Sequence, residues 1–178
     1  MPRWLYRILV VVSVFGFVMN AAAPTYAANG RVNCGVINKT TQYVICVDTT
    51  AQVGSVRSAS NGKIGEKVLG AFTVTTSRKD SDGPNSNGDT ITAEGHFMAG
   101  TPQKKTSIGL VQYIPFHGAQ GIHAYPNVGL EFDSHGCVRV TQETSDAIWV
   151  LLVAGEAGDL VSAGLVEFHI YSQPKKSK

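Results

Sequence analysis

Runs of β-branched and aromatic residues, separated by polar or glycine-containing stretches, recur along the chain from residue 42 onwards. Such runs are typical of β-strands. They predict strands at residues 42–48, 67–76, 91–98, 108–116 and 165–171. In the last run Val166, Phe168 and Ile170 alternate with Glu167 and His169, which is the period expected of a strand with one buried face.

Two polar segments separate these predicted strands. Asn61-Gly62 lies between the first two strands and is a strong turn signal, so we expect the domain to begin with antiparallel strands. Residues 77–90 contain Asp82-Gly83 and Asn87-Gly88. This composition predicts a surface loop rather than a linker between domains.

One segment has the period of a helix instead. Thr141 can cap its first turn, and Gly155 and Gly158 are expected to end it. Its apolar stripe is made of Ala147, Ile148, Leu151 and Leu152. With 178 residues, the chain has the length of one ordinary domain. The pattern therefore predicts a mainly β domain, a barrel or sandwich with one C-terminal-proximal α-helix.

The first residues of the chain differ in composition from the rest. Arg3 and Arg7 precede an apolar run over residues 8–19, and small residues follow as far as Ala27. This is the layout of a secretory signal peptide. The run is shorter than the roughly 20 apolar residues that a membrane span needs. We expect cleavage after Ala27 and export to the periplasm or cell envelope, and retention as a membrane anchor is the alternative.

The predicted organisation is a signal peptide at 1–27, an N-terminal segment at 28–41, a main domain at 42–171 and a basic flexible tail at 172–178. The formal net charge is +2, and removal of the signal peptide leaves 13 basic and 13 acidic residues. Three of these basic residues lie in the tail, at Lys175, Lys176 and Lys178. This balance predicts no nucleic-acid partner.

The chain has three cysteines, which cannot all pair with one another. Cys34 and Cys46 flank a short polar stretch, and a disulfide between them would stabilise the fold by up to about 3 kcal/mol in the loop-entropy account. The alternative is that both are small buried hydrophobic residues. Cys137 is then the odd cysteine. Since exported proteins meet an oxidising compartment where stray thiols tend to pair, a free thiol there is expected to be reactive.

Cys137 follows Gly136 and lies within reach of several histidines. A thiol becomes a useful nucleophile when an imidazole removes its proton. His135 is two residues away, where contact is poorly aimed, whereas His117 and His123 can approach from a neighbouring strand. Gly136 allows a sharp turn, and backbone N–H groups beside Cys137 could hold a developing oxyanion. These residues indicate acyl transfer by a cysteine nucleophile.

The run Ser134-His135-Gly136-Cys137-Val138-Arg139-Val140 resembles the Ser-His-Gly-Cys-Val/Ile-Arg-Leu/Met signature of the L,D-transpeptidase catalytic domain (YkuD-like) family. Gly121-Ile122-His123-Ala124 resembles the Ala-Ile-His-Gly run that carries the family's catalytic histidine. The resemblance therefore assigns the base to His123 and makes residues 42–171 the catalytic domain. Ala124 replaces the usual glycine, and a glycine instead follows His117, so His117 is the alternative base.

The resemblance implies a cofactor-free reaction on peptidoglycan stem peptides. Cys137 would attack the bond between the third stem residue and D-alanine, and the resulting thioester would pass to an amine of a second stem. Water as acceptor would give an L,D-carboxypeptidase, and a lipoprotein lysine would anchor that protein to the wall. Arg139 would recognise a stem carboxylate or brace the loop, while Ser134, His135 and Gly136 would shape the loop.

Two other kinds of function compete with this interpretation. Zinc could be bound by His117, His123, His135 and Cys137, although their spacing differs from that of common zinc sites. A catalytically silent domain that binds the cell wall is the other alternative. The cysteine-nucleophile interpretation expects neither a metal nor a cofactor.

Overall fold

The computed structural model describes residues 34–77, 91–129 and 134–173. The predicted signal peptide at 1–27, residues 78–90 of the predicted loop and residues 174–178 of the predicted tail lie outside these residues. Within the described residues, no helix has the length and apolar character needed to cross a bilayer.

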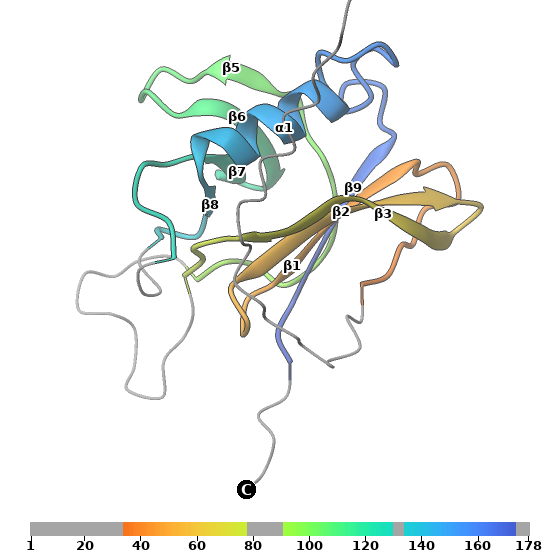
Figure 1. Ribbon diagram of the computed structural model, residues 1–178, viewed down its shortest axis with the longest axis horizontal. Helices are drawn as coiled ribbons and strands as arrows, with labels where there is room; N and C mark the ends of the chain where they lie inside the picture. The colour runs from red at the N-terminus through yellow and green to blue at the C-terminus, as the bar shows by residue number, and fades with distance from the viewer. Residues whose placement is uncertain (1–33, 78–90, 130–133, 174–178) are drawn as a thin grey trace, which may run out of the picture. The chain divides into compact units, whose positions relative to one another are not determined.

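Two mixed β-sheets and one helix make up the described part of the chain (Figure 1). The first sheet has the order β3 (Lys63–Thr73), β2 (Val53–Ser60), β1 (Tyr43–Asp48), β9 (Val166–Tyr171) and β4 (Gly95–Met98). The second has the order β5 (Gln103–Lys105), β6 (Val111–His117), β7 (Gln120–Ala124) and β8 (Val138–Val140). Helix α1 (Gln142–Leu152) follows β8 directly. The mainly β fold class with one helix near the C-terminus is confirmed.

Two strand pairs are parallel, β1 with β9 and β7 with β8, and the other pairs are antiparallel. An isolated bridge joins the sheets: Thr75, just beyond β3, exchanges two backbone hydrogen bonds of 2.9 Å with Arg139 of β8. The free edge of β8 is thus occupied next to the cysteine motif. This bridge fixes the position of β8 relative to the end of β3 in the first sheet.

Both sheets and α1 contribute to one apolar core. Its fully buried members include Ile45 and Phe168 from the first sheet, Ile114 and Ile122 from the second, and Leu152 from the helix. Burying a side chain of this size stabilises a fold by about 1.5–3 kcal/mol. The apolar positions predicted for the last strand, Val166, Phe168 and Ile170, all belong to this core. The expectation of a single buried face is wrong, because Glu167 on the opposite face is also buried, at 2% exposure.

The predicted turn at Asn61-Gly62 is confirmed, but it joins a strand pair that the sequence pattern did not define. Both residues have positive φ, 51° and 73°, as in the tight turn that matches strand twist. The hairpin pairs β2 with β3. β2 was missed, as were the short strands β5, β7 and β8, and β3 covers 63–73 rather than the predicted 67–76. The sequence of β2, VGSVRSAS, has weak strand propensity, and pairing on both sides makes it a strand.

The helix starts where the sequence predicts. Thr141 is its N-cap, and its hydroxyl oxygen accepts a hydrogen bond of 3.2 Å from the backbone N–H of Thr144. The helix ends at Leu152, before the glycines expected to stop it. Gly155 instead permits a close backbone approach, since a Cβ there would collide with the carbonyl oxygen of Val150.

The segment before β1 is tied down by a disulfide and a buried polar cluster. Cys34 and Cys46 form a disulfide, with their Cα atoms 5.7 Å apart. Of the two alternatives for these cysteines, the disulfide is therefore confirmed. The carboxylate of Glu167, which is buried, accepts hydrogen bonds from the N–H groups of Ile37 and Asn38 and from the hydroxyl of Thr41. A buried carboxylate needs such donors to offset its loss of hydration.

His169 extends this cluster and makes it sensitive to pH. Gly35 N–H donates to His169 Nδ1 at 2.7 Å, so this nitrogen is unprotonated. Burial and the neighbouring His96 lower the pKa of His169, and Glu167 opposes them. Because the folded pKa is below the unfolded value, the contribution of His169 to the free energy of unfolding is present above about pH 6.5 and is lost as the pH falls towards the folded pKa.

We therefore expect urea denaturation to show a fall in the free energy of unfolding from pH 7 to pH 5, and a smaller fall in His169→Asn. The asparagine Oδ1 can still accept the Gly35 hydrogen bond, but it does not titrate in this range. His96, which stacks on His169 with ring centroids 3.8 Å apart, remains in both proteins. Equal losses of stability in the two proteins would contradict this role of His169.

Candidate active site

Parallel pairing of β7 with β8 brings the histidine and cysteine motifs together. His123 is in register with Arg139, one residue after the pair formed by Ile122 and Val138. Side chains two residues apart along a strand point to the same side. Cys137, immediately before β8, therefore lies on the same face as Arg139 and close to Gly121 of β7. Two separate motifs of the sequence meet at one edge of the second sheet.

The loop before Cys137 has the geometry that a glycine permits. Gly136 has φ of 98°, a conformation that side-chain-bearing residues rarely adopt, so the sharp turn expected here is confirmed. Ser134 is fully buried, and its hydroxyl has no hydrogen-bond partner among the described residues. His135 is exposed. The backbone that leads to Cys137 is therefore fixed by a buried serine, Ser134, and by the turn at Gly136.

The Cys137 thiol is partly buried between two backbone groups of the β6–β7 hairpin. Its Sγ lies 3.9 Å from the carbonyl oxygen of Ala119, which accepts from the thiol. Burial raises the pKa of Cys137, while a hydrogen bond from the backbone of Gly121 and the charge of Arg139 lower it. Since burial is the largest of these effects, the resting group is a thiol rather than a thiolate.

His123 is held in one tautomer. Its side chain is only 3% exposed, and its Nδ1 lies 2.8 Å from the carbonyl oxygen of Ala124. A carbonyl can only accept, so Nδ1 carries the proton and Nε2 has a free lone pair. Burial lowers the pKa of His123, the Ala124 carbonyl opposes this, and Arg139 lowers the pKa further. At neutral pH His123 is therefore uncharged and able to accept a proton at Nε2.

Arg139 acts on both groups from a buried position. Its side chain is 9% exposed, and its Cζ lies 4.1 Å from the centroid of the Tyr125 ring. A guanidinium over an aromatic face gains a cation–π attraction of about 0.5–2 kcal/mol. Arg139 thus has an internal structural partner, and its positive charge favours the thiolate form of Cys137 and the neutral form of His123.

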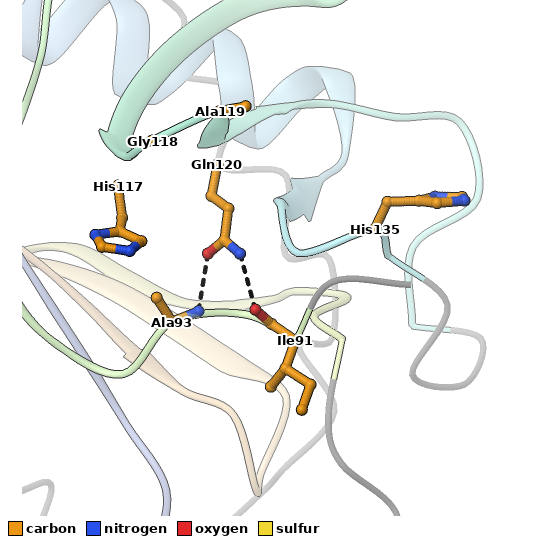
Figure 2. A pocket seen from close by; sticks show the side chains of 7 residues that line it. All are labelled: Ile91, Ala93, His117, Gly118, Ala119, Gln120 and His135. Atoms are coloured by element: carbon orange, nitrogen blue, oxygen red, sulfur yellow. Dashed lines mark hydrogen bonds between the residues drawn. The ribbon is translucent and has the colours of Figure 1, made fainter. Parts of the chain in front are cut away.

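A cavity of about 370 Å³ lies at the β6–β7 turn (Figure 2). Neither Cys137 nor His123 is among its lining residues. Ala119, whose carbonyl faces Cys137, is one of its lining residues, and His117, Gln120 and His135 line it as well. The Gln120 side chain spans its floor, accepting from the N–H of Ala93 and donating to the carbonyl of Ile91, each at 2.8 Å. In Figure 2 the His135 ring points away from Gln120.

The alternative base, His117, lies at the exposed end of β6. Its ring packs against Phe97, with the centroids 5.0 Å apart. Among the described residues no hydrogen bond holds the His117 ring, in contrast to the fixed Nδ1 of His123. Within the described ranges, moreover, His, Cys, Asp and Glu form no group of three or more that could hold a metal ion.

Sequence reasoning missed three contributors to this site: Tyr113, Gln120 and the Ala119 carbonyl. Tyr113 donates its hydroxyl hydrogen bond to Ala119 at 2.9 Å. One sequence signal could have indicated it. Gly121 interrupts a strand, which often marks the close approach of another group, and the Tyr113 ring occupies the space where a Cβ of Gly121 would lie.

Comparison with known proteins is consistent with this geometry. The family model described as the L,D-transpeptidase catalytic domain matches residues 35–161. An L,D-transpeptidase from Stackebrandtia nassauensis has a similar structure, with 15% identity and a TM-score of 0.57 over 79% of this chain and 61% of that one. One from Xylanimonas cellulosilytica has 16% identity and a TM-score of 0.52 over 76% of this chain and 63% of that one.

These structural similarities, at such low identity, concern the fold alone. The chain spans less than two thirds of the length of either solved relative. A comparison with curated proteins gives no match.

Proposed function

The chain belongs to the L,D-transpeptidase catalytic domain family, which acts on peptidoglycan, and from this premise we propose that Cys137 is the nucleophile of an acyl transfer between stem peptides. The observation that carries the proposal is the arrangement of two groups: a partly buried thiol at Cys137, and His123 with Nε2 unprotonated. The family's substrate lies outside the cytoplasm, and the Cys34–Cys46 disulfide suits that compartment.

The resting pair is uncharged, so proton transfer accompanies attack. Burial favours the thiol over the thiolate and neutral His123 over its cation. When a stem carbonyl reaches Sγ, His123 Nε2 takes the thiol proton and sulfur bonds to the carbonyl carbon. Arg139 stabilises the negative charge that develops on sulfur. Backbone N–H groups beside Gly136 and Cys137 are the candidates to stabilise the oxyanion.

The tetrahedral intermediate then collapses. The bond between the carbonyl carbon and the D-alanine nitrogen breaks, and the imidazolium of His123 returns the proton to the leaving amine. The product is a thioester between Cys137 and the L-centre of the third stem residue. In the second step an acceptor amine loses a proton to His123 and attacks the thioester, and the sulfur leaves as the thiol of Cys137. The first step leaves a neutral His123 beside the thioester. In the second step the imidazolium of His123 passes its proton to the departing sulfur, which restores the neutral resting pair.

The cavity beside Ala119 gives a stem peptide room to approach the thiol from the side of His117 and Gln120. Arg139 is engaged with Tyr125, so its role in this proposal is electrostatic rather than direct recognition of a stem carboxylate. His135, exposed on the cavity wall, contributes to the shape of the entrance.

The test is to incubate the purified protein with a stem tetrapeptide and to follow D-alanine release and intact protein mass. We expect an adduct with the mass of the tripeptide acyl group, and a cross-linked product when an amine acceptor is added. If free tripeptide were the sole product even with an amine acceptor present, the activity would be L,D-carboxypeptidation rather than transpeptidation. Absence of both D-alanine and adduct would overturn the proposal and leave a silent wall-binding domain.

A further inference from the structure

Tyr113 of β6 meets the Cys137 thiol at a shared oxygen atom. The Tyr113 hydroxyl donates to the carbonyl oxygen of Ala119 at 2.9 Å. The same oxygen lies 3.9 Å from Cys137 Sγ and accepts from the thiol. Tyr113 itself is only 7% exposed, whereas Ala119 is exposed and Cys137 is partly buried, so the two contacts meet where the buried ring reaches the surface of the domain. One carbonyl therefore has two competing donors, a phenol and a thiol.

The ring of Tyr113 also supports the other backbone group that holds the sulfur. It lies against Gly121, where an added Cβ would collide with the ring. The backbone of Gly121 hydrogen-bonds to Cys137 and favours its thiolate. Tyr113 thus contacts both residues whose backbone groups face the sulfur: it donates to the carbonyl that favours the thiol, and it packs on the residue that favours the thiolate.

We propose that Tyr113 is a positioning residue of the cysteine site, whose hydroxyl anchors the Ala119 carbonyl and so makes the Cys137 thiol easier to deprotonate. A carbonyl oxygen facing a sulfur stabilises S–H and repels S⁻. A hydroxyl that donates to this oxygen occupies one of its lone pairs and offsets part of its negative charge. The phenol therefore weakens the carbonyl's hold on the thiol proton.

The phenol stays a donor throughout the reaction. Burial and the nearby Cys137 raise the pKa of Tyr113 above its ordinary value, so the hydroxyl keeps its proton when the thiolate forms. The other titratable or charged groups around Cys137 are His123 and Arg139 on the adjoining strands and His135 before the cysteine. None of these is altered by a change at Tyr113 that preserves the ring.

The turn itself does not depend on the hydroxyl alone. Gln120, next to Ala119, is fixed by two hydrogen bonds to the backbone of Ile91 and Ala93 (Figure 2). Removal of the Tyr113 hydroxyl should therefore leave the Ala119 carbonyl near the sulfur while removing its second donor. This makes Tyr113→Phe a test of the hydroxyl rather than of the fold.

The experiment measures the rate of Cys137 alkylation by iodoacetamide between pH 6 and 11 in the parent protein and in Tyr113→Phe. We expect the midpoint of the rate profile to move to higher pH in the variant. Loss of a single hydrogen bond predicts a rate at pH 7 lower by roughly fivefold, with the two proteins converging where both thiols are ionised. Tyr43→Phe, at a partly buried tyrosine of β1, is the matched control and should keep the parent profile.

A midpoint that is unchanged in Tyr113→Phe, or a rate that is lower by the same factor at every pH, would overturn the proposal. The role of Tyr113 in catalysis rests on the proposed function, in which Cys137 is the nucleophile. Alkylation nevertheless reads the thiol directly and needs no stem peptide. A protein that fails to release D-alanine but shows the expected profile shift would refute the proposed reaction and leave the role of Tyr113 in place.

Discussion

Replacing Cys137 by alanine is expected to abolish acylation, with no adduct from a stem tetrapeptide or a carbapenem and a loss of D-alanine release of more than about a thousandfold. The physical reason is that no other thiol can take over. The chain has three cysteines, and Cys34 and Cys46 are joined in a disulfide on the first sheet. Intact-mass spectrometry of parent and variant, with the same reagents and times, measures the effect.

A matched control separates chemistry from folding. Titration of the unfolded, unreduced parent should find one thiol, and the same titration of Cys137→Ala should find none. The variant should unfold at nearly the same urea concentration as the parent, because Cys137 is only partly buried and contributes little to the core. An adduct that persists in the folded variant would rule out Cys137 as the nucleophile.

Of the elements around this cysteine, the sequence predicted the helix that follows β8 but not the short strands β7 and β8 themselves. The cap at Thr141 is a local signal and is confirmed. The alternation of residues 166–170 predicts which side chains enter the core but not the burial of Glu167 on the other face. The strand β2 has no such signal. It is held by β1 on one side and β3 on the other, so its conformation depends on residues distant in sequence. Propensity alone therefore fails there.

In the site, too, the features set by neighbouring residues could be predicted, and those set by residues distant in sequence could not. The φ of Gly136 agrees with the sharp turn that the sequence predicts, whereas the Ala124 carbonyl that fixes Nδ1 of His123 is known from the structure. The contacts of Tyr113 and Gln120 depend on the β6–β7 turn and on residues 91–93, which meet Gln120 across a long stretch of chain. No spacing in the sequence encodes that meeting, although Gly121 marks where a ring has to fit.

The identity of the base can be decided by comparing His123→Ala with His117→Ala. We expect carbapenem acylation to fall by about 10²–10⁴-fold in His123→Ala, the range that a general base contributes, and by less than about threefold in His117→Ala. The reason is geometric. His123 is buried with Nε2 unprotonated, and its strand adjoins the residues around Cys137, whereas the His117 ring packs on Phe97 at the exposed end of the hairpin.

The pH profile gives this comparison a second, independent measure. Burial lowers the pKa of His123, so the neutral base persists below the ordinary histidine value of about 6.5. The acylation rate of the parent and of His117→Ala should accordingly fall on the acid side with a midpoint below pH 6.5. The residual acylation rate of His123→Ala should show no such fall. If His117→Ala instead lost both the rate and this fall on the acid side while His123→Ala kept them, the base would be His117. The exposed ring would then have to leave Phe97 and turn towards the thiol, at the cost of its aromatic contact.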